Sequence, residues 1–181
     1  MTSSHSEGLI DIEELYKVEC ESLTTSGTCS AMFTACSMAS AVEALGMVHP
    51  GTAAHAAVTR ENDVTEQKKQ DCKDTVHTLF GMLRQGLTAS KIITSKSIEN
   101  AIMVVYALGG STNCILHLLA IAHEANIPLD IHEMGALGAK IPLIGNLSPH
   151  GPWHMVDLDS VGGVPAVQKE LLEAGRTHFL P

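Results

Sequence analysis

The sequence predicts a mainly helical fold with a little β structure, and three observations lead to that prediction. Hydrophobic residues make up 45% of the 181 residues but aromatic residues only 3%. The core therefore has to be built from aliphatic side chains and methionine, which suit close helix packing. The run from Met32 to Leu45 is rich in helix-favouring residues. Between Cys72 and Leu83 the apolar residues recur at spacings of four, three, one and three, which is typical of a helix with one apolar face.

Length, charge and cysteine content restrict the class of protein. A chain of 181 residues is long enough for one domain with a sizeable core. Its net charge of -9 argues against a nucleic-acid or anionic-membrane partner, and no apolar run reaches the ~18 residues that span a bilayer. The N-terminus has no secretory signal, and five cysteines without paired spacing indicate reduced thiols. We therefore expect a soluble intracellular protein, located in the cytoplasm or an organelle matrix.

The first third of the chain is divided by clear helix signals. Residues 1–9 are polar and are expected to be disordered, whereas residues 10–181 contain no linker and are expected to form one unit. Asp11 followed by Glu14 resembles a capping box that opens a short helix. In the segment Gly27–Met47, a small-residue turn leads into the long apolar helix, and a His-Pro-Gly sequence then ends it.

Four further helices are expected after a loop. The first starts near Thr65 and ends at Gly86, and the second is capped by Thr94 or by the serine that follows it. The third follows a Gly-Gly-Ser turn and ends at Asn126, a residue type that tolerates the left-handed conformation. Trp153 and the two residues after it are a candidate short strand, and a final helix starts at Pro165.

Cys29 is the first candidate functional residue. If the long helix begins directly after it, its thiol lies at a helix N-terminus, where the helix dipole lowers the pKa of a thiol and favours the thiolate that binds metals. The alternative is a buried cysteine with a purely structural role, which is the common environment of a free cysteine. Cys72 and His77 have no partner at ligand spacing and are expected to be structural.

The turn Gly109–Asn113 is the second candidate. The exposed amides of a new helix N-terminus can bind a carboxylate or phosphate, which makes Gly110, Ser111, Thr112 and Asn113 candidate substrate-binding residues. The alternative is an ordinary joint between two helices. His117, which lies between two leucines on the following helix, is expected to be either a hydrogen-bonded core histidine or a neighbour of a substrate pocket.

Both candidate segments resemble the dihydroxy-acid dehydratase family, which includes related sugar-acid dehydratases. Around Cys29 this chain departs from the family by carrying Ser30-Ala31 in place of Gly-Gly and Cys36 in place of Asn. Around the second turn it carries the family's Gly-Gly-Ser-Thr-Asn sequence, and Gly110 favours the dihydroxy-acid branch. The resemblance covers about residues 10–175. The first segment matches at Gly27, Cys29, Met32, Thr34, Ala35, Met38–Ala41 and Glu43–Met47.

The resemblance implies the latter half of an α/β N-terminal domain and a site that is incomplete in this chain. It implies that Cys29 is one ligand of an iron–sulfur cluster and that the enzyme also uses Mg²⁺. In the family, the other cluster cysteines lie upstream of the matched region, and a barrel domain lies downstream of it. On a continuous helix Cys29 and Cys36 would be about 10 Å apart along the axis, too far to share one cluster. The sequence of this chain does not identify the catalytic residues, which stay unknown.

Several functions remain open. The first is a hydro-lyase of branched-chain amino-acid synthesis that converts a 2,3-dihydroxy acid to a 2-oxo acid, with this chain an incomplete copy. It would act on a small hydroxy acid as a homodimer or with a partner that supplies the missing domain. The second is a non-catalytic remnant that serves as an interaction module through an exposed apolar face. The others are a fragment of a sugar-acid dehydratase and an unrelated helical domain.

Overall fold

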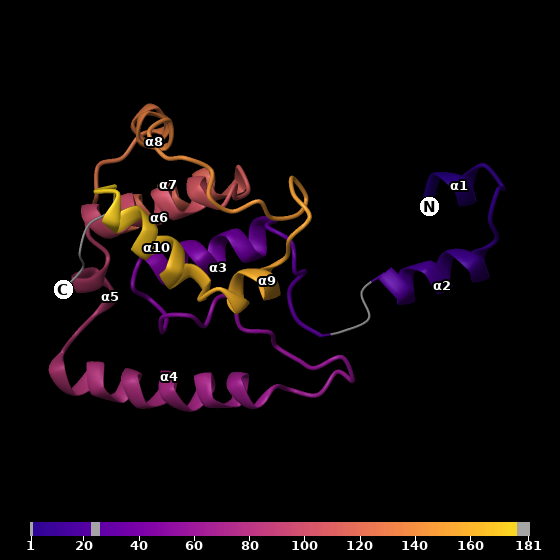
Figure 1. Ribbon diagram of the computed structural model, residues 1–181, viewed down its shortest axis with the longest axis horizontal. Helices are drawn as coiled ribbons and strands as arrows, with labels where there is room; N and C mark the ends of the chain where they lie inside the picture. The colour runs from indigo at the N-terminus through magenta and orange to yellow at the C-terminus, as the bar shows by residue number, and fades with distance from the viewer. Residues whose placement is uncertain (1, 23–25, 177–181) are drawn as a thin grey trace.

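The computed structural model describes residues 2–22 and 26–176 (Figure 1). Residue 1 and residues 177–181, which belong to the expected units 1–9 and 10–181, lie outside the described residues. Within this part of the chain the β structure consists of two isolated bridges, Val58 with Val64 and Leu147 with Trp153. The expected mainly helical fold with a little β structure is confirmed. The helices are α1 (Thr2–Ser6), α2 (Ile12–Ser22), α3 (Thr34–Ala44), α4 (Glu66–Gln85), α5 (Ala89–Ile92), α6 (Ser95–Ala107), α7 (Asn113–Glu124), α8 (Ile131–Gly138), α9 (Met155–Ser160) and α10 (Gly163–Glu173).

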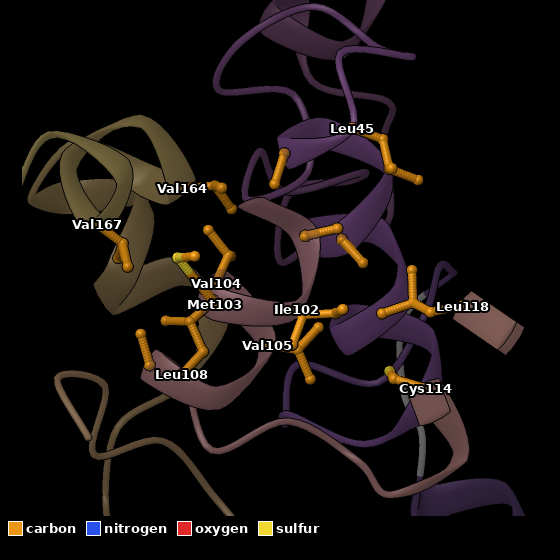
Figure 2. Packing of buried hydrophobic residues seen from close by; sticks show 14 of the residues in the cluster. Leu45, Ile102, Met103, Val104, Val105, Leu108, Cys114, Leu118, Val164 and Val167 are labelled. Carbon is orange, nitrogen blue, oxygen red and sulfur yellow. The ribbon is translucent and has the colours of Figure 1, made fainter. Parts of the chain in front are cut away.

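Helix α6 forms the centre of the core because it is apolar on almost all sides. It contacts α3, α7, α8 and α10, and a helix of this kind is stable only when neighbours surround it. Figure 2 shows Ile102 and Val105 of α6 near Leu118 of α7, while Val104 and Met103 lie toward α10. The buried residues of α6 are Ser97, Ile98, Asn100–Val105 and Ala107.

Helix α3 packs closely on α6 because its buried face is made largely of small side chains. Ala41 and Ala44 are fully buried there, as are Ser37 and Ser40, and small residues reduce the distance between helix axes. The buried hydroxyls are satisfied within α3 and its entry: Ser40 Oγ donates to the Cys36 carbonyl oxygen at 2.9 Å and Ser37 Oγ to the Met32 carbonyl oxygen at 3.2 Å. Polar atoms at this helix interface therefore carry no desolvation penalty from missing partners.

The predicted helix ends are confirmed where local chemistry sets them. Thr94 and Ser97 form a reciprocal capping box at the start of α6. Thr65 caps α4 by accepting a hydrogen bond from the Lys68 N–H at 3.1 Å, and Gly86 ends the helix in the left-handed conformation, with φ 61°. These are short-range interactions, so a few consecutive residues suffice to specify them.

One expectation differs from the structure. Thr2–Ser6, inside the segment expected to be disordered, form α1, which packs beside α2. Figure 1 shows both helices to one side of the other helices. The apolar stripe predicted from the spacing lies on α4 and is exposed to solvent: Val76, Leu79 and Phe80 are 53%, 52% and 55% exposed. Among the described residues of α4, only Asp71 is buried, because polar side chains make the contacts of this helix with the rest of the protein.

Candidate functional site

The residues Thr28–Phe33, here named the cysteine turn, are held in place by a distant part of the chain. The Met32 N–H donates to the Ser148 carbonyl oxygen at 2.7 Å, and the Met155 N–H donates to the Ser30 carbonyl oxygen at 2.8 Å. Met32 itself is buried in the core. Two backbone hydrogen bonds and one buried anchor thus fix the turn that carries Cys29.

Helix α3 begins later than expected, and this changes the surroundings of Cys29. Its first residue is Thr34 and its N-cap is Phe33, so Cys29 lies in an irregular turn before the helix. The prediction that the helix dipole acts directly on the Cys29 thiol is therefore wrong, because this effect falls off within the first helical turn. Cys29 is half-buried, so the alternative of a fully buried structural cysteine is not supported either.

The expected separation of Cys29 and Cys36 is also wrong. The Cys36 thiol donates a hydrogen bond to the Cys29 carbonyl oxygen, with Sγ and O 2.8 Å apart, and the Thr28 hydroxyl lies 3.8 Å from the same sulfur. The calculation of about 10 Å assumed a continuous helix through both residues. Because the cysteine turn is not helical, it folds back over the first turn of α3 and brings its backbone to Cys36.

Burial raises the pKa of the Cys36 thiol above its ordinary value. The hydrogen bond with Thr28 lowers this pKa, whereas the neighbouring Cys29 raises it through its charge and its thiol. The Cys36 thiol is therefore protonated at neutral pH and serves as a hydrogen-bond donor.

The turn Gly109–Asn113 lies against the same end of α3. The Ser111 N–H donates to Ser37 Oγ at 2.9 Å, and the hydroxyls of Ser111 and Thr34 are 3.1 Å apart. The side-chain amide of Asn113 donates to Thr34 Oγ1 at 2.7 Å. The first turn of α3 therefore brings the two predicted site segments together, with Cys36 on one side and Thr34 and Ser37 facing the second turn.

Glycine at position 110 is required by close packing. A Cβ atom there would lie 2.8 Å from Val105 Cγ1 and 3.1 Å from the Val105 carbonyl oxygen, which is shorter than ordinary contacts allow. The Gly110 N–H donates to that carbonyl oxygen at 2.8 Å. The turn is thus fitted tightly to the end of α6.

Most of the backbone N–H groups of the Gly109–Asn113 turn donate hydrogen bonds to other groups of the protein. Besides Gly110 and Ser111, the Asn113 N–H donates to Ser111 Oγ at 3.2 Å and the Cys114 N–H to the Ser111 carbonyl oxygen at 3.0 Å. These backbone donors therefore have partners before any ligand arrives. Thr112 and Asn113 are exposed, so their side chains are the groups of this turn that are accessible to a substrate.

Among the other residues singled out in the sequence, Cys114 adjoins the Gly109–Asn113 turn, whereas His117, Cys72 and Cys20 face solvent. His117 is exposed on α7, so the expectation of a core histidine is wrong. Cys72 and Cys20 are exposed, whereas Cys114 is buried. A cavity of about 490 Å³ between residues 144–147, α9 and α10 includes neither Cys29 nor the Gly109–Asn113 turn.

The sequence analysis missed a group of polar residues between α3, the loop after it and α4. Glu43 is buried on α3 and accepts hydrogen bonds from the N–H groups of Gly51 and Ala53 at 2.6 and 2.9 Å. Burial raises the pKa of this carboxyl despite those two hydrogen bonds. The signal that could have revealed it is a single carboxylate within the small-residue run of α3, since an acidic residue on a buried face needs partners.

His55 and Asp71 connect this loop to α4. His55 Nδ1 lies 2.8 Å from Asp71 Oδ2, and Lys68 Nζ lies 3.3 Å from the same oxygen. Burial alone would raise the pKa of Asp71, but hydrogen bonds from His55, Gln67 and Lys68 and the charge of His55 lower it below its ordinary value. This cluster is a structural joint that fixes α4 to the loop.

The described residues do not form a complete iron–sulfur site. Such clusters are commonly held by four cysteine thiolates, and the cysteine turn brings only Cys29 and Cys36 into one place. In residues 2–22 and 26–176 there is no group of three or more His, Cys, Asp or Glu side chains arranged to hold a metal ion. Over the same residues, no helix has the length and hydropathy that are needed to cross a membrane.

Comparison with known proteins shows which family this arrangement represents. The family described as "Dihydroxy-acid/6-phosphogluconate dehydratase N-terminal" matches residues 1–179. A dihydroxy-acid dehydratase of Acidothermus cellulolyticus is 45% identical over 171 residues, which are 94% of this chain and 30% of the relative. Dihydroxy-acid dehydratase 2 of Staphylococcus saprophyticus is 43% identical over 96% of this chain and 30% of the relative.

A third relative has a similar identity and coverage. The dihydroxy-acid dehydratase of Sulfolobus acidocaldarius is 44% identical over 93% of this chain and 29% of its own length. This chain thus spans about 30% of the length of the curated relatives it matches. Because the family match covers almost every residue, the chain belongs to the dihydroxy-acid/6-phosphogluconate dehydratase family and corresponds to sequence of its N-terminal domain.

Proposed function

We propose that this chain is part of a hydro-lyase that converts a 2,3-dihydroxy acid to a 2-oxo acid and water, as in branched-chain amino-acid synthesis. The observation that carries the proposal is the convergence of the cysteine turn and the Gly109–Asn113 turn on the first turn of α3, through Cys36, Thr34 and Ser37. Relatives at 43–45% identity over nearly the whole chain are named dihydroxy-acid dehydratases. Their name supports the dihydroxy-acid substrate over a sugar acid, which is the other substrate class of the family.

Each turn would have a separate role. Cys29, half-buried at the edge of the cysteine turn, would contribute one thiolate to an iron–sulfur cluster. Thr112 and Asn113 would offer hydroxyl and amide groups to the hydroxyl or carboxylate of the substrate. Asn113 is oriented for this by its hydrogen bond to Thr34. The described residues contain no group of three or more His, Cys, Asp or Glu side chains arranged to hold a metal ion, so the Mg²⁺ expected from the family would be held by groups outside them.

The reaction needs more protein than this chain supplies. The described residues bring two thiols together, whereas a cluster iron is commonly held by ligands from several cysteines. We propose that a further polypeptide, or a further segment of a longer one, completes the site. The proposal includes a homodimer or a heteromeric complex as the active form.

The experiment compares the chain alone with the chain completed by a relative. The purified chain is reconstituted without oxygen with iron and sulfide, supplied with Mg²⁺ and a 2,3-dihydroxy-3-methyl acid, and assayed for the 2-oxo acid. We expect no turnover from the chain alone. Turnover should appear after co-expression with the sequence of a dihydroxy-acid dehydratase that flanks the matched region on both sides.

Single cysteine variants test whether turnover and the cluster depend on Cys29 and not on an exposed cysteine elsewhere. Cys29→Ser should abolish the restored turnover, and the cluster absorbance should fall with it. Cys72→Ser is the matched control, because Cys72 is exposed on α4 and should leave both readouts unchanged. Turnover by the chain alone would contradict the incomplete-copy proposal, and preference for a sugar acid would favour the other branch of the family.

A second candidate function, an interaction module without catalysis, is favoured by the exposed stripe on α4. Val76, Leu79, Phe80 and Leu83 form this stripe, and a groove lined by apolar side chains of α3 and α4 lies beside Val76. We propose that the part of the relatives' sequence without a counterpart here covers this face, since the chain spans only about 30% of their length. Exposed apolar patches of this kind mark interaction surfaces.

This candidate is tested by the solution behaviour of the chain. Size-exclusion chromatography and binding of a hydrophobic dye should report an accessible apolar surface, and Phe80→Ser combined with Leu83→Ser should reduce the dye signal. Addition of the flanking sequence of a relative should also reduce it. A clean monomer that binds no dye would contradict the interaction module.

A further inference from the structure

Cys29 and Cys36 contact each other through the Cys36 thiol and the Cys29 backbone, and no role described so far uses the two residues together. The Cys36 sulfur lies 2.8 Å from the carbonyl oxygen of Cys29, so the side chain of one residue contacts the backbone of the other. The Cys29 sulfur remains on the same side of the turn, 3.8 Å from the Ala31 carbonyl oxygen. The other three cysteines make no contact with this pair among the hydrogen bonds of the described residues.

We propose that Cys29 and Cys36 are a reversible redox pair that forms an intramolecular disulfide on exposure to a peroxide. Rotation of the Cys36 side chain away from the Cys29 carbonyl oxygen redirects its sulfur within the space enclosed by the turn. The residues between them are not helical up to Phe33, so the two cysteines can reach disulfide geometry without breaking a helix between Cys29 and Phe33. The proposal is independent of the proposed dehydratase function, since it needs only the two thiols and an oxidant.

The difference in exposure sets the order of the two steps. Cys29 is half-buried whereas Cys36 is 4% exposed, so the peroxide reaches Cys29 first. The Cys29 thiol is oxidised to a sulfenic acid as the peroxide O–O bond breaks and one water is released. The Cys36 sulfur then attacks the Cys29 sulfur, and the hydroxyl leaves as a second water. Together the two thiols lose two electrons, and hydrogen peroxide is reduced to two molecules of water.

The disulfide would protect Cys29 as well as block it. A sulfenic acid next to a resolving thiol is converted to a disulfide before further oxidation makes the damage irreversible. While the disulfide persists, the Cys29 sulfur has no thiolate for a metal ion. Reduction by a dithiol restores it.

The test locates the bond by cleavage between the two cysteines. The reduced full chain, with Cys20 and Cys72 changed to Ser, is treated with hydrogen peroxide, denatured, alkylated and cut with chymotrypsin, which cleaves after Phe33. We expect the peptides that carry Cys29 and Cys36 to stay joined until dithiothreitol is added. Alkylation of Cys29 should fall by about tenfold and recover on reduction.

Two variants and one internal control make every outcome informative. In Cys36→Ser the disulfide should be absent and a sulfenic-acid probe should label Cys29, whereas in Cys29→Ser the buried Cys36 should stay alkylatable after denaturation. Cys72 of the unmodified chain, which is exposed, confirms that the peroxide dose oxidises accessible thiols. The same peptide mapping is repeated on the unmodified chain, so the result does not depend on whether a variant folds. Separate Cys29 and Cys36 peptides after an effective dose, or a link from Cys29 to Cys114, would overturn the proposal.

Discussion

Helices α6 and α4 both carry apolar residues at helical spacing, but those residues are buried in α6 and exposed in α4. In α6 the side chains from Asn100 to Val105 are all buried, and the helix is enclosed by α3, α7, α8 and α10. In α4 the apolar stripe is exposed, and Figure 1 shows this helix along one edge of the molecule. An apolar period therefore predicts that a helix forms and that one face is apolar, but it does not reveal what covers that face.

Polar contacts explain how α4 stays attached without burying its stripe. Near its N-terminal half, Asp71 meets His55 at 2.8 Å, and Lys68 Nζ donates to the Thr52 carbonyl oxygen at 3.2 Å. His49 Nε2 lies 2.7 Å from the Thr78 hydroxyl. All three contacts reach the loop after α3, so α4 is fixed by hydrogen bonds where α6 is fixed by packing.

The largest expected effect is at the centre of α6. Ile102→Ala removes apolar atoms from a fully buried site and should lower the free energy of unfolding by about 2–5 kcal/mol, because the cavity it leaves closes only in part. Urea denaturation followed by circular dichroism measures the change. A loss below about 0.5 kcal/mol would contradict the assignment of α6 as the centre of the core.

An intermediate effect is expected where α4 is attached. Asp71→Asn weakens the contact with His55 and leaves polar groups without a full partner, which should cost about 1–3 kcal/mol. Hydrogen exchange should rise in α4 and remain unchanged in α6. Asp74→Asn is the matched control on the same helix, because Asp74 is exposed, its side chain accepts from Gln70, and its contact with His49 is made by the backbone carbonyl oxygen, which the substitution keeps. Equal effects of both variants would contradict the proposed attachment.

The effect of Asp71 should depend on pH in a defined direction. Its pKa is lowered in the folded protein, so its contribution to stability is present above the ordinary carboxyl pKa and is lost as the pH falls through the lowered folded value. The difference in stability between the unmodified chain and Asp71→Asn should therefore shrink as the pH falls below about 4. A difference that stays constant from pH 6 to pH 3 would show that the carboxylate charge has no part in it.

The smallest effect is expected on the stripe of α4. Leu83 is 65% exposed, so Leu83→Gln should change the free energy of unfolding by less than about 0.5 kcal/mol. The same urea titration detects it. A loss as large as that of Ile102→Ala would mean that a partner, such as a second copy of the chain, covers the stripe in solution.

Local signals predicted much of the fold, and long-range contacts account for what was missed. The caps at Thr65 and Thr94 and the left-handed Asn126, with φ 55°, follow from neighbouring residues, so the sequence sufficed. The path of the cysteine turn depends on Ser148 and Met155, more than a hundred residues away. Without that information the predicted helix included the turn, and for that reason the proximity of Cys29 to Cys36 was not predicted.

The residues of the candidate site stay a prediction from the resemblance, and their geometry could not be predicted from the sequence. The resemblance identified Cys29 and the Gly109–Asn113 turn, yet nothing in the sequence indicates that Thr34 and Ser37 connect that turn to α3. Glu43 lies in the segment that matches the family, but that match does not indicate its partners, and the pair of His55 and Asp71 carries no motif. They are recognisable only once the loop after α3 has been placed beside α4.

The two backbone hydrogen bonds that hold the cysteine turn, from Met32 to Ser148 and from Met155 to Ser30, have a consequence for synthesis on the ribosome. The turn emerges early, but its partners are translated only after most of the helices. Until Met155 has left the exit tunnel, Cys29 and Cys36 belong to an unanchored nascent segment. Thiol chemistry that depends on their arrangement therefore begins only after Ser148 and Met155 have emerged and can hold the turn.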